Sequence, residues 1–201
     1  MKLRIAIQQK GRLKTDSWQL LARWGLRFTP EARTLIAPCL NADVEVVTLR
    51  QSDIPRYVER GIVDFGIVGN NVLREQLRPV QTVQPLGFGS CNLVIAVPNI
   101  SQITTIEQLQ GKRIATSYPN SLQHYLDSIA LYAKIVQMSG SVEAAPELDI
   151  ADAICDLTQT GTTLAAHDLT PIVTVYQSEA VLIAPTNLTQ SQQTFIKQYV
   201  L

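Results

Sequence analysis

The sequence is poor in the residues from which metal centres, disulfide frameworks and nucleophilic active sites are commonly built. Its 201 residues include only three cysteines and two histidines. The cysteines, Cys39, Cys91 and Cys155, are odd in number and lack a CxxC spacing, which argues against a disulfide scaffold or a zinc site. Neither His124 nor His167 accompanies a GxSxG motif or a paired cysteine signal. Chemistry that depends on a protein nucleophile is therefore not expected.

Long apolar runs and an excess of one charge are also lacking. No apolar run approaches the ~18 residues that span a bilayer. The N-terminal MKLRIAIQQKGRLK is interrupted by Arg4 and by polar residues too early for a signal peptide. Lys plus Arg and Asp plus Glu both number 17, so no net charge attracts nucleic acid. We expect a cytoplasmic protein that binds neither a membrane nor nucleic acid.

The charge is balanced overall but unevenly distributed. Residues 1–60 hold eleven Lys and Arg against six Asp and Glu. Between Lys134 and Lys197 there is no basic residue, although seven acidic residues lie in that interval. A basic first part suggests an anionic ligand there, but solvated helix faces would give the same pattern.

Short β-branched runs alternate with helical patterns, which is typical of an α/β fold with a largely parallel sheet. The glycines of LGFGSCN at 86–92 suggest a crossover, and a return near 176–179 would make one lobe discontinuous. We expect one α/β lobe from residues 1–89 plus 178–201 and a second from 90–177, with a ligand cleft between them. The strands are expected at 3–7, 44–49, 63–69, 93–98, 112–116, 133–137, 153–155, 172–176 and 180–184, and the helices at 17–24, 53–61, 120–131, 142–148, 162–167 and 188–200.

Hydroxyl side chains surround a glycine where one of these helices is expected to begin. Thr160, Thr162 and Thr163 flank Gly161, directly after the expected strand that ends near Asp156. Free backbone N–H groups at a helix start bind phosphate without needing a cation. The segment therefore predicts a phosphate site, with an ordinary threonine-capped helix as the alternative.

The second lobe also offers carboxylates and an aromatic ring near strand ends. Glu143, Asp152 and Asp156 could converge on one face, where carboxylates bind sugar hydroxyls or Mg²⁺. Helix capping is the alternative for this group. Tyr118 follows the expected strand 112–116 and could stack on a flat base, or could simply pack in the interior.

Basic residues follow strands of the first lobe. Lys10, Gly11 and Arg12 come directly after the first strand, at the carboxyl end where α/β proteins bind ligands. Arg33 and Arg50 lie in expected loops around strands, and arginine pairs bidentately with phosphate oxygens. Surface solubility is the alternative for each residue taken alone.

Taken together, these segments resemble the ATP phosphoribosyltransferase family, which opens histidine biosynthesis. The resemblance covers essentially the whole chain. Its motifs are IAIQQKGRL (5–13), RTLIAP (33–38), LRQSDIPRYVERGIVDFGIVGNNVL (49–73), LGFGSCNL (86–93), GKRIATSYPN (111–120), SGSVEAAPE (139–147) and ADAICDLTQTGTTL (151–164).

The resemblance implies two lobes similar to type II periplasmic binding proteins, with the site between them. It also implies the reaction. N1 of the ATP adenine attacks C1 of phosphoribosyl pyrophosphate (PRPP) in line, and pyrophosphate leaves with Mg²⁺ without a covalent enzyme intermediate. Such chemistry needs orientation of the reactants and stabilisation of the leaving charge, which agrees with the missing nucleophile.

The resemblance assigns roles to the candidate residues. The turn from Thr160 to Thr163 would hold the 5-phosphate of PRPP, and the three carboxylates would face the ribose hydroxyls or Mg²⁺. The metal would be bound through substrate phosphates, without identified protein ligands. Tyr118 would contact adenine. The ATP phosphates and the pyrophosphate would be surrounded by Lys10, Gly11, Arg12, Arg33 and Arg50, of which the three arginines would stabilise the leaving group.

The length resembles the short form of the family, which has no C-terminal regulatory domain. That form works with a regulatory partner resembling histidyl-tRNA synthetase, in a hetero-octamer. Two alternatives stay open: a small-ligand binding module of the same fold, and a subunit that is inactive without its partner.

Overall fold

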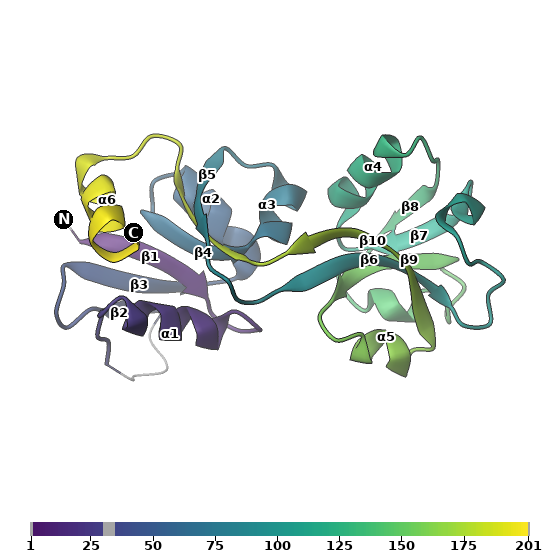
Figure 1. The fold of residues 1–201 in the computed structure, drawn as a ribbon, viewed down its shortest axis with the longest axis horizontal. Coiled ribbons are helices and arrows are strands. Elements are labelled where there is room, and N and C mark those ends of the chain that lie inside the picture. The colour runs from purple at the N-terminus through teal and green to yellow at the C-terminus, as the bar shows by residue number, and fades with distance from the viewer. Residues whose placement is uncertain (1, 30–34, 201) are drawn as a thin grey trace. The chain divides into compact units, whose positions relative to one another are not determined.

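The computed structural model describes residues 2–29 and 35–200 and divides into two compact units, each with its own mixed sheet (Figure 1). The first unit comprises Met1–Leu73, Leu77–Gly89 and Glu179–Leu201, and the second comprises Arg74–Gln76 and Ser90–Ser178. None of the helices in the described ranges is long and apolar enough to cross a membrane.

The sheet of the first unit has the strand order β2-β3-β1-β4-β11-β5. Strand β1 pairs in parallel with β3 and β4, whereas β11 is antiparallel to β4 and β5, and β2 is antiparallel to β3. The strands are β1 (Leu3–Gln8), β2 (Ile36–Pro38), β3 (Val44–Leu49), β4 (Phe65–Gly69), β5 (Val80–Pro85) and β11 (Ala180–Pro185). The helices are α1 (Lys14–Arg23), the 3₁₀ turn η1 (Gln51–Asp53), α2 (Ile54–Glu59), α3 (Asn70–Gln76), α6 (Gln190–Phe195) and the π-helical turn η4 (Ile196–Val200).

Both faces of this sheet are covered, because successive side chains of a strand point to opposite faces. Ile5 and Ile7 of β1 pack in one buried cluster with Leu21 of α1 and Phe195 of α6. Ala6, between them, belongs to the other cluster, with residues of α2 and α3. The apolar run LRIAI thus reads as a strand buried on both faces, as expected for parallel pairing.

The sheet of the second unit has the order β10-β6-β9-β7-β8, in which β7 is parallel to β8 and β9, and β6 is antiparallel to β9 and β10. Helix α4 packs on one face through Leu122 and Leu126. Val142 and Leu164 cover the other face. The elements are β6 (Cys91–Pro98), η2 (Ile106–Leu109), β7 (Arg113–Thr116), α4 (Pro119–Ser128), β8 (Lys134–Gln137), η3 (Val142–Ala144), β9 (Ala153–Thr158), α5 (Thr162–Ala166) and β10 (Leu169–Ser178).

The predicted α/β class is confirmed, and the nine expected strands all exist. Two strands, β2 and β5, were not expected, and neither was α3, which directly follows β4. The expected helix at 142–148 is only the short η3, because Pro146 allows no continuous helical ladder there. The units divide between residues 89 and 90 and between 178 and 179, while the last turn of α3 groups with the second unit.

Truncation of Phe195 should strongly destabilise the first unit. Its side chain is 3% exposed, and its ring lies 5.0 Å from that of Phe65 and 4.9 Å from that of Tyr199. We expect Phe195→Ala to lower the free energy of unfolding by about 3–5 kcal/mol, since it leaves a cavity between α6 and the sheet. Urea unfolding measures this change. Lys197→Ala, on the exposed side of the same segment, should stay within about 0.5 kcal/mol of the parent protein.

Candidate active site

The segment Thr160–Thr163 forms a tight turn at the carboxyl end of β9. Gly161 has φ +77° and precedes the first residue of α5, and its N–H donates to Thr158 Oγ1 at 2.9 Å. The Thr160 and Thr162 hydroxyls lie 2.7 Å apart. The helix first pairs its own N–H groups at Ala165, which donates to the Gly161 carbonyl. The N–H groups before Ala165 are those that a helix leaves for an outside acceptor.

Two of the three predicted carboxylates lie close to this turn in the second unit. Asp156 is on β9, two residues before Thr158, and Glu143 is on η3, in the loop that follows β8. Burial raises the pKa of the Asp156 carboxyl, and the nearby charge of Glu143 raises it further, while the N–H of Leu157 opposes the shift by donating to Asp156 Oδ1 at 2.8 Å. A hydroxyl that donates to one carboxylate, or a cation between the two, would stabilise the ionised pair.

Asp152 does not join this pair, and the expected convergence of three carboxylates is wrong in this respect. It precedes β9 and therefore lies at the amino end of the strand, whereas Asp156 and the turn lie toward its carboxyl end. Its Oδ2 accepts the Arg113 N–H at 2.8 Å, and its Oδ1 lies 3.1 Å from Arg113 Nη2. Asp149 binds the same guanidinium at 2.9 Å. Arg113 accordingly holds the pKa of Asp152 below its usual range.

Tyr118 lies at the carboxyl end of β7, which is parallel to β9, so Tyr118 and the Thr160–Thr163 turn share one end of the second sheet. It is the residue before α4, with its N–H donating to Thr116 Oγ1 at 2.9 Å. Its half-buried ring packs against the core that contains Leu122. Part of the Tyr118 side chain therefore packs in the interior, as the alternative interpretation expected. The rest of the side chain is exposed to solvent.

In the first unit, the basic residues follow the carboxyl ends of β1 and β3. Lys10 and Arg50 are exposed, and Gly11 has φ +106°. The Arg12 side chain is instead held by hydrogen bonds, because its Nη1 donates to the Gly89 carbonyl and its Nη2 lies 3.5 Å from Asn71 Oδ1. The predicted residue Arg33 lies outside the described residues.

The described residues supply no activated protein nucleophile. Cys155 is fully buried in β9, and burial raises the pKa of its thiol far above neutral, so it stays protonated and inert. Among residues 2–29 and 35–200, no group of three His, Cys, Asp or Glu side chains gathers to hold a metal ion.

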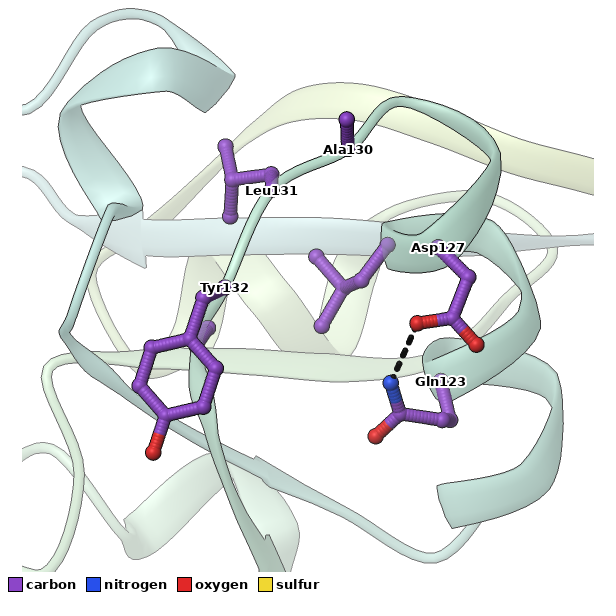
Figure 2. Close-up of a pocket in the computed structure, with 7 residues that line it drawn as sticks. Gln123, Asp127, Ala130, Leu131 and Tyr132 are labelled. Carbon is purple, nitrogen blue, oxygen red and sulfur yellow. Dashed lines mark hydrogen bonds between the residues drawn. The ribbon is translucent and has the colours of Figure 1, made fainter.

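A pocket of about 280 Å³ opens elsewhere in the second unit, at the end of α4 (Figure 2). Gln123 Nε2 donates to Asp127 Oδ1 at 2.7 Å on one side, and Tyr132 stands on the other. Its remaining lining is aliphatic, including Leu126 and Leu131. Because residues 130–133 lead into the amino end of β8, this pocket lies at the opposite end of the sheet from Tyr118 and the threonine turn.

A sequence model of one family, HisG, described as ATP phosphoribosyltransferase, matches residues 50–201. An ATP phosphoribosyltransferase of Cytophaga hutchinsonii is 43% identical over 196 residues, which are 98% of this chain and 68% of that protein. Another, from Maricaulis maris, is 45% identical over 188 residues, covering 90% of this chain and 64% of the relative. The chain thus spans about two thirds of the length of these relatives.

The chain belongs to the ATP phosphoribosyltransferase family. This confirms the predicted family, a group of pentosyltransferases that catalyse the first step of histidine biosynthesis. Among solved structures, the HisG:HisZ ATP phosphoribosyltransferase complex from Thermotoga maritima contains a chain with a TM-score of 0.81 and 27% identity, and the match covers 98% of this chain and 96% of that one.

Periplasmic binding proteins share the fold. The alkanesulfonate-binding protein SsuA from Xanthomonas axonopodis pv. citri has a TM-score of 0.63 at 16% identity, over 98% of this chain and 70% of that chain. This likeness concerns the fold alone and confirms the expected similarity to periplasmic binding proteins.

Sequence reasoning missed residues that hold the family's motifs in place. Asn71 is 2% exposed and lies beside Arg12, and Arg113 fixes Asp152. Asn71 belongs to the GNN segment, directly after a buried apolar strand. The abrupt change from apolar to amide side chains was the signal in the sequence that could have identified Asn71.

The two aspartates of the β9 segment should affect stability with opposite signs as the pH changes. The folded protein keeps the Asp156 proton to a higher pH than the unfolded chain, so ionisation of Asp156 destabilises the fold as the pH rises through this window. We expect Asp156→Asn, which cannot ionise, to be more stable than the parent at pH 7. The difference should vanish below about pH 4.

Asp152→Asn is the matched control, in the segment directly before β9. Because Arg113 lowers the pKa of Asp152, its charge stabilises the fold at neutral pH and loses this effect as the pH falls through the lowered pKa. The variant should therefore be less stable than the parent at pH 7. Urea midpoints across pH 3–8 measure both differences. A less stable Asp156→Asn variant at neutral pH would contradict a destabilising charge on Asp156.

Proposed function

We propose that the chain transfers the phosphoribosyl group of PRPP to N1 of ATP by direct in-line displacement. The N1 lone pair forms the bond to C1 of the ribose while the bond from C1 to the pyrophosphate oxygen breaks, and the electron pair leaves with pyrophosphate. The observation that supports this most strongly is the threonine turn beside the Glu143–Asp156 pair, within a member of this family.

The turn of Thr160–Thr163 is the proposed binding site for the 5-phosphate of PRPP. It combines hydroxyls with the N–H groups that precede Ala165, and both are donors to phosphate oxygens. No basic residue occurs in the sequence between Lys134 and Lys197. Phosphate binding by neutral donors leaves the positive charge of the arginines for the pyrophosphate, which is the group that gains charge in the reaction.

Glu143 and Asp156 are the proposed contacts of the ribose hydroxyls. Their mutual repulsion is relieved when a hydroxyl donates to one of them or when a cation lies between them. Mg²⁺ bound to the substrate phosphates would supply Lewis-acid stabilisation of the departing pyrophosphate. The two carboxylates offer the hard oxygen donors that such an ion prefers.

Lys10, Gly11, Arg12 and Arg50 of the first unit are the proposed contacts of the ATP phosphates and the pyrophosphate, together with Arg33. Lys10 and Arg50 are exposed after the carboxyl ends of β1 and β3. Arg12 would serve with the guanidinium nitrogens that Gly89 and Asn71 leave available. Tyr118 is the proposed contact of the adenine ring, which it would orient so that N1 points toward C1.

A regulatory partner is proposed from the Thermotoga maritima structure, which is a complex of HisG and HisZ. We propose that this chain also works with a HisZ-type subunit resembling histidyl-tRNA synthetase, in a hetero-octamer. The substrates are soluble metabolites of the cytoplasm, which is the proposed location.

The test is a direct assay of the purified chain with ATP, PRPP and Mg²⁺, alone and with a HisZ-type subunit. The ultraviolet absorbance of N1-substituted adenine and the release of pyrophosphate should rise together, and only when PRPP is present. Activity only with the partner would support a catalytic subunit that needs it. Binding of either substrate without any product, under both conditions, would leave only the solute-binding alternative.

Gly161→Val should raise the KM for PRPP. A β-branched side chain at φ +77° costs about 1–2 kcal/mol and shifts the turn whose N–H groups bind the phosphate. Apart from the two chain neighbours, no atom of the described residues lies within 4 Å of the added Cβ, so the effect comes from the backbone conformation and from bulk directed at the ligand. Steady-state kinetics with PRPP varied measures the change.

Gly111→Val is the matched control for this substitution. Gly111 has φ +74° and equally open surroundings, but precedes β7 at the amino end of the same sheet. Both variants should lose similar stability, and only Gly161→Val should change the KM for PRPP. Equal KM values in the two variants would remove the turn from the phosphate site.

A further inference from the structure

One buried hydroxyl connects the two strand ends that carry Tyr118 and Asp156. Thr116 is the last residue of β7 and has no exposed surface. Its Oγ1 donates to the Cys155 carbonyl at 2.6 Å and accepts the N–H of Tyr118 at 2.9 Å. Cys155 directly precedes Asp156 on β9. A threonine hydroxyl has a single donor hydrogen, so this pair of contacts uses it as donor and acceptor at once.

We propose that Thr116 is a positioning residue for phosphoribosyl transfer, which sets the spacing between Tyr118 and Asp156. The inference rests on the proposed function, in which Tyr118 contacts the adenine and Asp156 the ribose of PRPP. In-line attack requires N1 and C1 to be aligned at close range, and small displacements of either substrate are costly to the rate. Loss of a rigid connection between the two contacts should therefore lower kcat more than it weakens the binding of either substrate.

The chain before Tyr118 is held on the strand side by Thr116 and by Ser117, whose Oγ donates to the Met138 carbonyl at 2.9 Å. Of these two, Thr116 is the one that binds the Tyr118 N–H. Tyr118 has φ −126° and ψ 59°, outside the helical and extended regions, so neither a helix nor a strand ladder fixes its backbone. Beyond it, the carboxylate of Glu75 accepts the N–H groups of Asn120 at 3.0 Å and Ser121 at 2.9 Å. Tyr118 thus lies between the contacts of Thr116 and Ser117 before it and the Glu75 contacts after it, all within the second unit.

Thr116→Val tests the proposal because valine keeps the shape of threonine and removes the hydroxyl. Both the Cys155 carbonyl and the Tyr118 N–H then lose this partner. Thr116→Ser restores the hydroxyl and serves as the rescue variant. Thr194→Val is the matched control, since the Thr194 hydroxyl also donates to a backbone carbonyl, that of Gln190 at 2.9 Å, on α6 of the first unit.

We expect Thr116→Val to lower kcat by roughly 10- to 100-fold while the KM for PRPP changes by less than about threefold. Thr116→Ser should recover most of the parent kcat, and Thr194→Val should retain it. Thermal unfolding under assay conditions measures the folded fraction of every variant, because a merely structural hydroxyl would lower stability without changing kcat per folded molecule.

Three results would overturn the inference: a folded Thr116→Val variant with the parent kcat, a kcat loss that matches the loss of folded protein, or a folded serine variant as slow as the valine variant. If Thr116→Val does not fold, Glu75→Ala is the second test, because it removes the contacts on the other side of Tyr118. This variant should also lower kcat. A parent-like kcat would count against the proposal. A parent protein that forms no product, with or without the partner, would instead overturn the proposed function itself.

Discussion

Parallel pairing of β7 with β8 and β9 is the constraint on which the second unit depends. Parallel strands end at one edge, so the segments that follow them are brought together although they are far apart in the sequence. Tyr118, Glu143 and the turn of Thr160–Thr163 each follow the carboxyl end of one of these strands. The first unit repeats the arrangement around β1, β3 and β4, and the residues that follow its strand ends are basic or carry amides.

The two ends of β9 use aspartate in opposite ways. At the amino end, Arg113 surrounds Asp152 with N–H donors, so the ionised carboxylate is stabilised by the fold. Toward the carboxyl end, Asp156 is half-buried near Glu143 and its ionisation is opposed. The Arg113–Asp152 contacts hold the segment before β9 in place. The Glu143–Asp156 pair places unfavourable electrostatics at the proposed ribose site, where strongly shifted carboxylates are more common than in structural ion pairs.

The predictions from sequence succeeded where a pattern was local and failed where it depended on partners. The short β-branched and apolar runs at 44–49 and 3–7 identified strands, because such residues fit the buried faces of a sheet. Strand β5 was missed because VQTVQP has a polar exposed edge and a terminal proline, and its pairing with β11 is set by residues about a hundred positions away. The role of Arg12 was inferred from its charge, whereas its contact with the Gly89 carbonyl depends on where the chain leaves the first unit.

The sequence by itself determined the family, the α/β class and the chemistry of the threonine turn, since these reside in contiguous motifs whose residue types act locally. Tertiary structure alone decided which carboxylates share an environment. Asp152 and Asp156 are four positions apart and look equivalent in the sequence, yet a strand rises about 3.3 Å per residue and separates them to different ends of one sheet. It also decided that Thr116 connects Tyr118 with Cys155, because that contact exists only when β7 and β9 lie side by side in register.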